Sequence, residues 1–94
     1  MAAKKLGPLT QADIDHVTLI TNTRGSQFAQ PGLGPDPYTL VSTEVVSGGL
    51  QIDVKRQRTG STFSDKEHGD ELSDALINAV LTAIERRLQL KPAG

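Results

Sequence analysis

Two short stretches carry side chains that could do chemistry. The first, DIDH at 13–16, brings together Asp13, Asp15 and His16, and carboxylates and imidazoles are side chains that bind divalent metals. In an extended chain the two aspartates share one face while His16 points to the other, and no second histidine lies nearby in the sequence. We therefore expect a solvated segment at this position and no metal site.

The second stretch, HGDE at 68–71, offers His68, Asp70 and Glu71 for general acid–base catalysis. The two carboxylates lie where the sequence predicts the start of a helix, and negative charge at that end interacts favourably with the helix dipole. The chain contains no cysteine, and nothing in the sequence selects a nucleophile among the nearby serines, Ser61, Ser64 and Ser73. We expect helix capping rather than catalysis, and we predict a non-enzymatic protein without a cofactor.

The one basic cluster of the sequence consists of Lys55, Arg56 and Arg58, with Arg24 as a further candidate. Bases at the end of a strand prevent pairing between sheet edges, or they contact the phosphates of RNA or DNA, or they contact another protein. The net charge of −1 argues against bulk attraction to nucleic acid or to an anionic membrane surface. Nucleic-acid binding through these four residues is therefore the alternative function and not the favoured one.

The composition limits the core that can position these residues. The 94 residues allow one domain, but hydrophobic side chains make up only 36% of the chain. A thin core often depends on a partner for its stability. No apolar run is long enough to span a membrane, and the start lacks the apolar stretch of a secretory signal. We expect a cytoplasmic protein, or a component of a particle assembled in the cytoplasm.

Glycine and proline divide the first part of the chain. Residues 1–10 are expected to form an arm, and residues 11–94 a single small domain. The β-branched residues between His16 and Thr21 favour a strand. Thr10 could instead cap a helix that begins at Gln11, so helix and strand both stay open for residues 11–21. The stretch QPGLGPDP at 30–37 predicts a stiff connector, because its prolines fix φ and lack the amide donor.

Residues 38–58 predict a β-hairpin. The segments YTLVSTEVV and LQIDVKRQR flank Ser47, Gly48 and Gly49, and glycine supplies the positive φ that a two-residue turn requires. Alternation with polar residues gives each strand one apolar face, formed by Leu50, Ile52 and Val54 and by Val41, Thr43 and Val45.

Residues 65–90 predict a long helix that is more apolar than the hairpin can cover. Ser64 and Glu67 have the spacing of a capping box, and Arg86 and Arg87 lie near the expected end. Apolar positions occupy roughly 240° of its circumference, whereas a surface helix needs little more than about 100°. The surplus stripe is covered either by the N-terminal segment or, as we favour, by a second subunit. The predicted interface consists of Ile77, Leu81, Ile84 and Leu88.

Together these elements predict an α+β fold, in which a small antiparallel sheet, made of the N-terminal strand and the hairpin, packs against one long C-terminal helix. The function that we favour is a non-enzymatic structural or adaptor subunit that self-associates within a larger assembly, such as a phage particle or a protein shell. The expected partners are further copies and other assembly proteins, with no membrane. A third class also stays open, an inhibitor that presents the acidic residues 65–74 to a basic partner.

If residues 11–21 were helical, the order helix, three strands, helix would resemble the double-stranded RNA-binding domain. The last helix of that family presents lysines at its N-terminus to phosphates. The corresponding stretch of this sequence carries acidic side chains that would repel phosphates, namely Asp65, Glu67, Asp70, Glu71 and Asp74. The resemblance therefore covers the outline of the fold and not the phosphate-binding residues.

Overall fold

The computed structural model describes residues 3–92, and residues 1–2 of the predicted arm and 93–94 of the predicted domain lie outside that range. The elements in chain order are β1 (Lys4–Lys5), α1 (Gln11–Gly25), β2 (Phe28–Gln30), β3 (Gly34–Pro35), β4 (Tyr38–Val46), β5 (Gly49–Arg56), β6 (Thr62–His68), β7 (Glu71–Leu72), α2 (Asp74–Leu88) and β8 (Lys91–Pro92). This content confirms the predicted α+β class.

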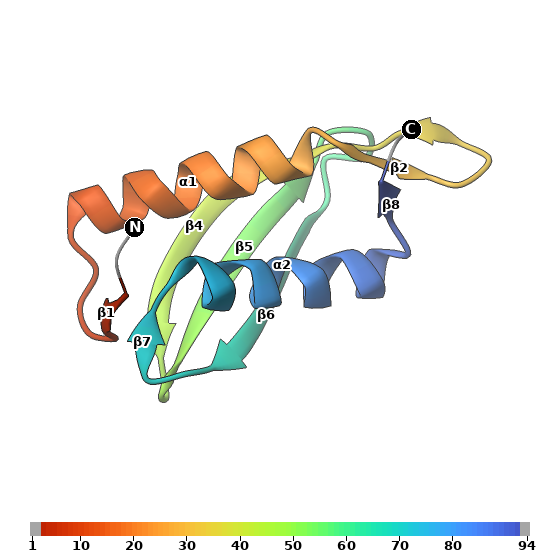
Figure 1. Cartoon of the computed structure of the whole chain (residues 1–94). Coiled ribbons are helices and arrows are strands. Elements are labelled where there is room, and N and C mark those ends of the chain that lie inside the picture. The colour runs from red at the N-terminus through yellow and green to blue at the C-terminus, as the bar shows by residue number, and fades with distance from the viewer. Residues whose placement is uncertain (1–2, 93–94) are drawn as a thin grey trace.

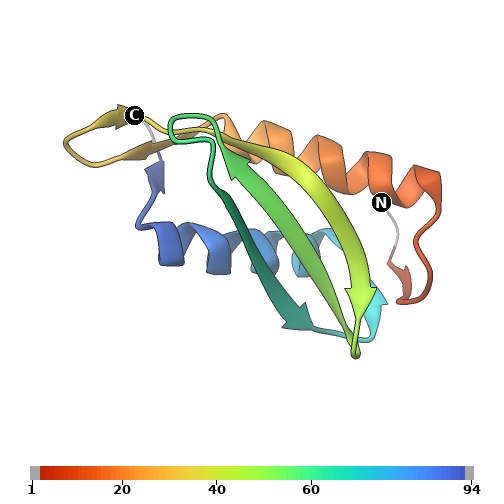
Figure 2. The same ribbon diagram turned by 180° about the vertical axis from the view of Figure 1, so that it is seen from behind.

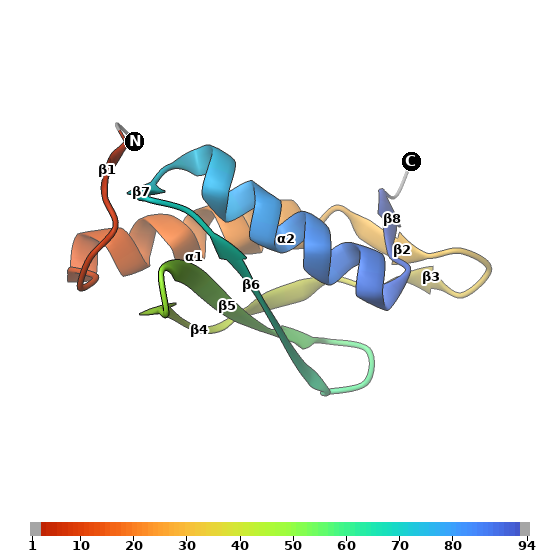
Figure 3. The ribbon, with the colours of Figure 1, turned by 90° about the horizontal axis from the view of Figure 1, so that it is seen from below.

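The main layer is an antiparallel sheet of order β4-β5-β6, and both helices cover the same face of it (Figures 1 and 2). Helix α1 packs mainly on β4, while α2 packs on β5 and β6. Short pairings join the remaining segments, because β1 pairs with β7 and β2 pairs with both β3 and β8. The molecule is elongated, with extents of 41 × 21 × 21 Å. The β2–β3 hairpin stands out at one end, and β1, β7 and the start of α1 lie at the other (Figures 1 and 3).

Strands β4 and β5 form the predicted hairpin. Their two-residue turn is Ser47-Gly48, with φ of 30° and 75°. The side chains of Leu50, Ile52 and Val54 are fully buried under the helices, as their alternation predicts. Val41 was expected on this apolar face and is 53% exposed instead. The reason is a register shift between Leu40 and Ser42, since a bulge turns the extra residue out of the alternation.

Residues 11–25 form helix α1, so the predicted N-terminal strand is wrong and the helical alternative holds. Thr10 caps the helix through a reciprocal capping box with Asp13. The buried stripe follows a spacing of four residues, Asp13, Val17, Thr21 and Gly25, and contains only one large apolar side chain. This inward face is therefore helical in spacing but polar in composition, which hides it from a search for hydrophobic periodicity.

The C-terminal helix is shorter than the predicted range 65–90. Residues 62–68 form strand β6, whose side chains alternate between exposed and half-buried, and α2 begins only after its N-cap Ser73. The capping-box spacing of Ser64 and Glu67 belongs to this strand instead. The third strand of the sheet was missed because its sequence TFSDKEH has only one apolar residue, Phe63.

The surplus apolar stripe of α2 is covered within the chain. Its four residues lie in the hydrophobic core, with exposures of 0% for three of them and 8% for Leu88. Helix α1 and the unpredicted strand β6 supply the additional cover, since both pack against α2. In this fold the stripe offers no surface to a second copy. The four residues that were predicted to form an interface belong instead to the core of the chain, namely Ile77, Leu81, Ile84 and Leu88. Self-association itself stays a prediction.

The stretch 30–37 is more ordered than a connector. It contains the end of β2, a tight turn and strand β3, which together form a small hairpin. Strand β8 pairs with the outer side of β2, so the C-terminal end of the chain flanks the base of this hairpin. The prolines and glycines build a turn that projects from the body rather than a link between two parts (Figure 3).

Candidate functional site

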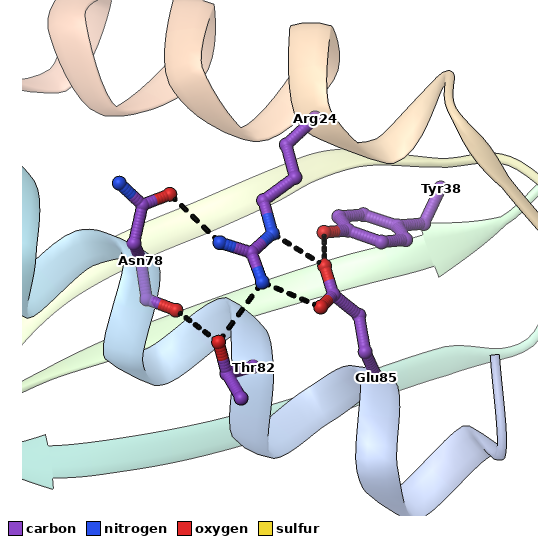
Figure 4. A network of polar contacts seen from close by, with 5 residues as sticks. All are labelled: Arg24, Tyr38, Asn78, Thr82 and Glu85. Carbon is purple, nitrogen blue, oxygen red and sulfur yellow. Dashed lines mark hydrogen bonds and ion pairs between the residues drawn. The ribbon is translucent and has the colours of Figure 1, made fainter. Parts of the chain in front are cut away.

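A buried polar network joins α1, β4 and α2 (Figure 4). The Arg24 guanidinium donates from Nε and Nη2 to the two carboxylate oxygens of Glu85, both at 2.7 Å. The same group donates to Asn78 Oδ1 at 3.0 Å and to Thr82 Oγ1 at 2.9 Å. The Tyr38 hydroxyl donates to Glu85 Oε2 at 2.5 Å. Glu85 thus accepts from three donors that belong to two other elements.

The electrostatics of the network favour one protonation state. Burial raises the pKa of the Tyr38 hydroxyl, and its hydrogen bond to the Glu85 carboxylate raises it further. The hydrogen bonds from Arg24 to Glu85 raise the pKa of the guanidinium above its ordinary value. Tyr38 therefore stays neutral and Arg24 stays charged at neutral pH, and neither group is prepared to exchange a proton.

The network acts as a clamp between elements rather than as a reactive centre. A bidentate arginine–carboxylate pair fixes both position and orientation, and here it fixes the C-terminal end of α1 against α2. Gly25 allows the close approach, because a Cβ at this position would overlap the Tyr38 carbonyl and ring. The carboxylate oxygens and the tyrosine hydroxyl are all engaged with one another, so the cluster leaves no acid or base directed at a substrate.

A second buried pair lies at the base of the projecting hairpin. Asp36 is fully buried and pairs with the guanidinium of Arg56, which also donates to Gln30 Oε1 at 3.1 Å. The Asp36 amide donates to the carbonyl of Phe28 at 3.1 Å. These contacts tie the hairpin to the end of β5 and hold both of its strands in place.

The predicted basic cluster is dispersed by the fold. Arg24 and Arg56 are committed to the buried carboxylates Glu85 and Asp36. Arg58 donates from Nη1 to the carbonyl of Leu33 at 2.6 Å and is exposed. Lys55 is exposed on β5. Only two of the four residues thus face solvent, which weakens the case for a phosphate-binding surface.

The residues of DIDH and HGDE have structural contacts. The Asp13 carboxylate accepts from the Thr10 amide, and the Asp13 amide donates to Thr10 Oγ1. The same carboxylate pairs with Lys4 at 2.7 Å, and the hydrogen bond from Lys4 lowers the pKa of Asp13. His16 Nε2 lies 2.8 Å from Asp74 Oδ1, and this contact lowers the pKa of Asp74. Asp70 accepts at its carbonyl from the Leu6 amide. Among residues 3–92, no three histidine, aspartate or glutamate side chains gather to hold a metal ion.

The tip of the projecting hairpin is a rigid turn with an exposed leucine. We call residues 31–33 the hairpin tip. The Leu33 amide donates to the Gln30 carbonyl at 2.9 Å, and Gly32 has a φ of 84°. Pro31 followed by a glycine of positive φ gives a type II turn, in which both central residues are preset. Leu33 is 55% exposed at the end of this turn.

The opposite end of the molecule is hollowed. A hollow of about 490 Å³ lies between the arm, the first turn of α1 and strand β4, and we call it the arm hollow. Its lining is largely apolar and consists of Gly7, Pro8, Leu9, Ile14, Thr43, Glu44 and Val45. A neighbouring hollow shares Val45 and is lined also by Asp70 and Glu71.

Comparisons of the chain with protein-family models, with curated proteins and with solved structures found no match. Residues 11–21 are helical, and helices α1 and α2 precede and follow the three strands of the main sheet. The N-terminus of α2 carries Ser73 as its cap and Asp74 in the first turn rather than lysines. No helix within residues 3–92 is long and apolar enough to cross a membrane.

Sequence reasoning missed the network and the hairpin tip. One signal was present for Glu85, because a carboxylate between Leu81 and Leu88 on an apolar stripe needs a charged partner if the stripe is buried. Arg24 lies 61 residues away in the sequence, and no local pattern connects the two. The hairpin tip carried the signal Pro31-Gly32, which is typical of a type II turn.

Proposed function

We propose that the chain is a non-enzymatic structural or adaptor subunit that self-associates within a larger assembly, of the kind that builds a phage particle or a protein shell. The observation that carries this proposal is the rigid projecting hairpin with Leu33 exposed at its tip. An apolar side chain held away from the body, on a segment fixed at its base, is a feature suited to docking.

The arrangement of polar groups supports a non-enzymatic role. Glu85 and Asp36 are buried, and each of these carboxylates is paired with an arginine. A general acid or base needs a perturbed group within reach of a substrate, whereas these groups contact one another. The strongest polar interactions of the described chain therefore serve to fix its elements.

The rigidity of the hairpin favours binding. Ordering a flexible loop on association costs free energy, and a segment already held in its bound form avoids that cost. Here Pro31 and Gly32 preset the turn, the Asp36–Arg56 pair fixes the base, and Arg58 bonds to the Leu33 carbonyl. The leucine side chain can thus be buried by a partner with little loss of conformational freedom.

Light scattering after size exclusion, over a concentration series from low micromolar upward, tests the proposal. We expect the mass to rise above the 10.0 kDa of one chain with concentration. Leu33→Asp should remain monomeric throughout. The matched controls are Leu19→Asp and Val41→Asp, since these two apolar residues are 64% and 53% exposed and lie on other surfaces.

The controls should associate as the unchanged protein does. A monomer at every concentration would exclude self-association as the function. Association that survives Leu33→Asp but is lost in Leu19→Asp or Val41→Asp would move the interface from the hairpin tip to α1 or to the bulge of β4.

A further inference from the structure

We propose that the hairpin tip of one copy docks into the arm hollow of a second copy, so that copies join head to tail. This inference rests on the proposed self-association and names the surfaces that carry it. The two surfaces lie at opposite ends of a molecule 41 Å long, so one copy cannot satisfy its own tip (Figure 1).

Both ends of the molecule offer apolar surface. The hairpin tip presents Leu33 and Pro31, both exposed, on a preset turn. The arm hollow offers a mainly apolar lining of about 490 Å³, which is ample room for one leucine side chain. Burying a leucine removes apolar surface from water at both partners. In the proposed contact the tip is the plug, and the hollow, which is open to solvent, is its socket.

The charges around the two surfaces are complementary. Cations lie beside the tip, because Arg58 bonds to the Leu33 carbonyl and a second hollow, of about 500 Å³ and next to Pro31, is lined by Arg86 and Lys91. Glu44 lines the arm hollow itself, and the adjoining hollow adds two carboxylates and one lysine, Asp70, Glu71 and Lys5. The carboxylates Asp36 and Glu85 near the tip are already neutralised by arginines. A positive end therefore meets a mostly negative one, which favours this pairing over tip to tip.

A head-to-tail contact is heterologous, because it uses a different surface on each of the two copies. A row of copies therefore has one free tip and one free hollow at its ends, and it either grows as a filament or closes into a ring. The contact includes exposed charges of opposite sign, and salt screens them. We therefore expect association to weaken as the salt concentration rises.

The test uses one variant for each surface. Leu33→Asp removes the plug and leaves the hollow intact. Gly7→Trp is designed to block the hollow, since Gly7 lines it and a Cβ at this position meets no atom within 4 Å, which leaves space for a large side chain. Gly7→Ala is the matched control because its methyl group leaves most of the hollow open. Glu44→Lys provides a second hollow variant that reverses an exposed charge and adds no bulk.

Leu33→Asp alone and Gly7→Trp alone should each be monomeric up to concentrations at least tenfold above those at which the unchanged protein associates. An equimolar mixture of Leu33→Asp and Gly7→Trp should form a one-to-one dimer and nothing larger, because each dimer contains one intact tip and one intact hollow. Gly7→Ala should behave as the unchanged protein, and Glu44→Lys should weaken association.

Three results would overturn the inference in distinguishable ways. If the unchanged protein is monomeric, the proposed function fails together with the inference. If it associates but Gly7→Trp and Glu44→Lys associate equally well, the proposed function stands and the hollow is not the socket. If both variants are monomeric, folded by circular dichroism, and stay monomeric when mixed, the interface is not head to tail.

Discussion

Helix α1 is tied to the molecule at both of its ends by ionic contacts, and the two ends are built differently. At the C-terminal end Arg24 pairs in bidentate fashion with Glu85, whose side chain is only 7% exposed. Toward the N-terminal end Asp13 pairs with Lys4, whose side chain is 47% exposed, and His16 contacts Asp74, whose side chain is 49% exposed. Charged hydrogen bonds are strong away from water, whereas surface ion pairs contribute little. The hairpin end is therefore fixed firmly, and the end that carries the arm hollow is held more weakly.

This difference suits the two roles that we propose. A projecting tip binds best when it is preset, and the buried pairs Arg24–Glu85 and Arg56–Asp36 supply that rigidity at their end of the molecule. A hollow that receives a side chain can tolerate adjustment of its walls.

The largest effect is expected from Glu85→Ala. The change leaves Arg24 without its carboxylate and Tyr38 without its acceptor. Removing one partner of a buried ion pair typically costs about 3–5 kcal/mol, and we expect a loss of this order in the free energy of unfolding by urea. The double variant Arg24→Met with Glu85→Leu should recover much of the loss. A loss below about 1 kcal/mol would show that the clamp is not a main support of the fold.

A smaller loss, about 2 kcal/mol, is expected from Asp36→Asn, because the amide keeps one acceptor for Arg56 while the charge attraction disappears. The change acts at the base of the hairpin. Hydrogen exchange should therefore quicken at the Leu33 amide, which bonds to the Gln30 carbonyl. Exchange at Ile77 in α2 should rise only with the global loss. Equal local acceleration at both amides would mean that the pair does not fix the hairpin in particular.

The middle of α1 should tolerate change and even gain from it. Thr21 is fully buried, and its hydroxyl has no hydrogen-bond partner among the described residues. Thr21→Val keeps the shape and removes the unpaired polar group, so we expect a gain of about 1 kcal/mol in the free energy of unfolding. A loss on this substitution would indicate that the hydroxyl has a partner in solution, such as a buried water.

The smallest effect concerns the weaker end and depends on pH. The pKa values of Asp13 and Asp74 are lowered in the folded chain by Lys4 and His16. A lowered folded pKa contributes stability above the unfolded pKa, and that contribution is lost as the pH falls through the folded value. We expect the melting temperature to fall modestly on acidification from roughly pH 5 downward.

The control is the pair of variants Asp13→Asn and Asp74→Asn. Each should flatten the acid dependence and lower stability near neutral pH by less than Glu85→Ala does. An acid dependence that is unchanged in both variants would assign the effect to other carboxylates.

The sequence predicted the elements whose faces are apolar, and it failed where polar residues fill the inward face. Leu50, Ile52 and Val54 identify β5 by alternation alone. Helix α1 could not be recognised in the same way, because Asp13 and Thr21 occupy its buried stripe. Asp13 is paired with Thr10 and Lys4, and the Thr21 hydroxyl has no partner among the described residues. Neither position is apolar, so a search for hydrophobic periodicity passes over this face.

The same limit applies to the function. The four leucine and isoleucine residues assigned to an interface do form an apolar stripe, but their cover, α1 and β6, was itself misread. Arg24 and Arg56 could be counted as basic residues, whereas their commitment to Glu85 and Asp36 depends on tertiary structure. The turn at the hairpin tip could have been predicted from the sequence, since Pro31-Gly32 is typical of a type II turn. Its projection from the body could be learned only from the fold.

The most direct test of the account is an NMR dilution series on the unchanged protein with assigned backbone amides. Two separate groups of amide signals should shift with concentration, one at residues 32, 33 and 58 and one at residues 7, 9 and 43–45, while the signals of the buried face of α2 stay constant. Shifts confined to one of the two ends, or found instead at α2 or on the exposed face of the sheet, would contradict head-to-tail association through the hairpin tip.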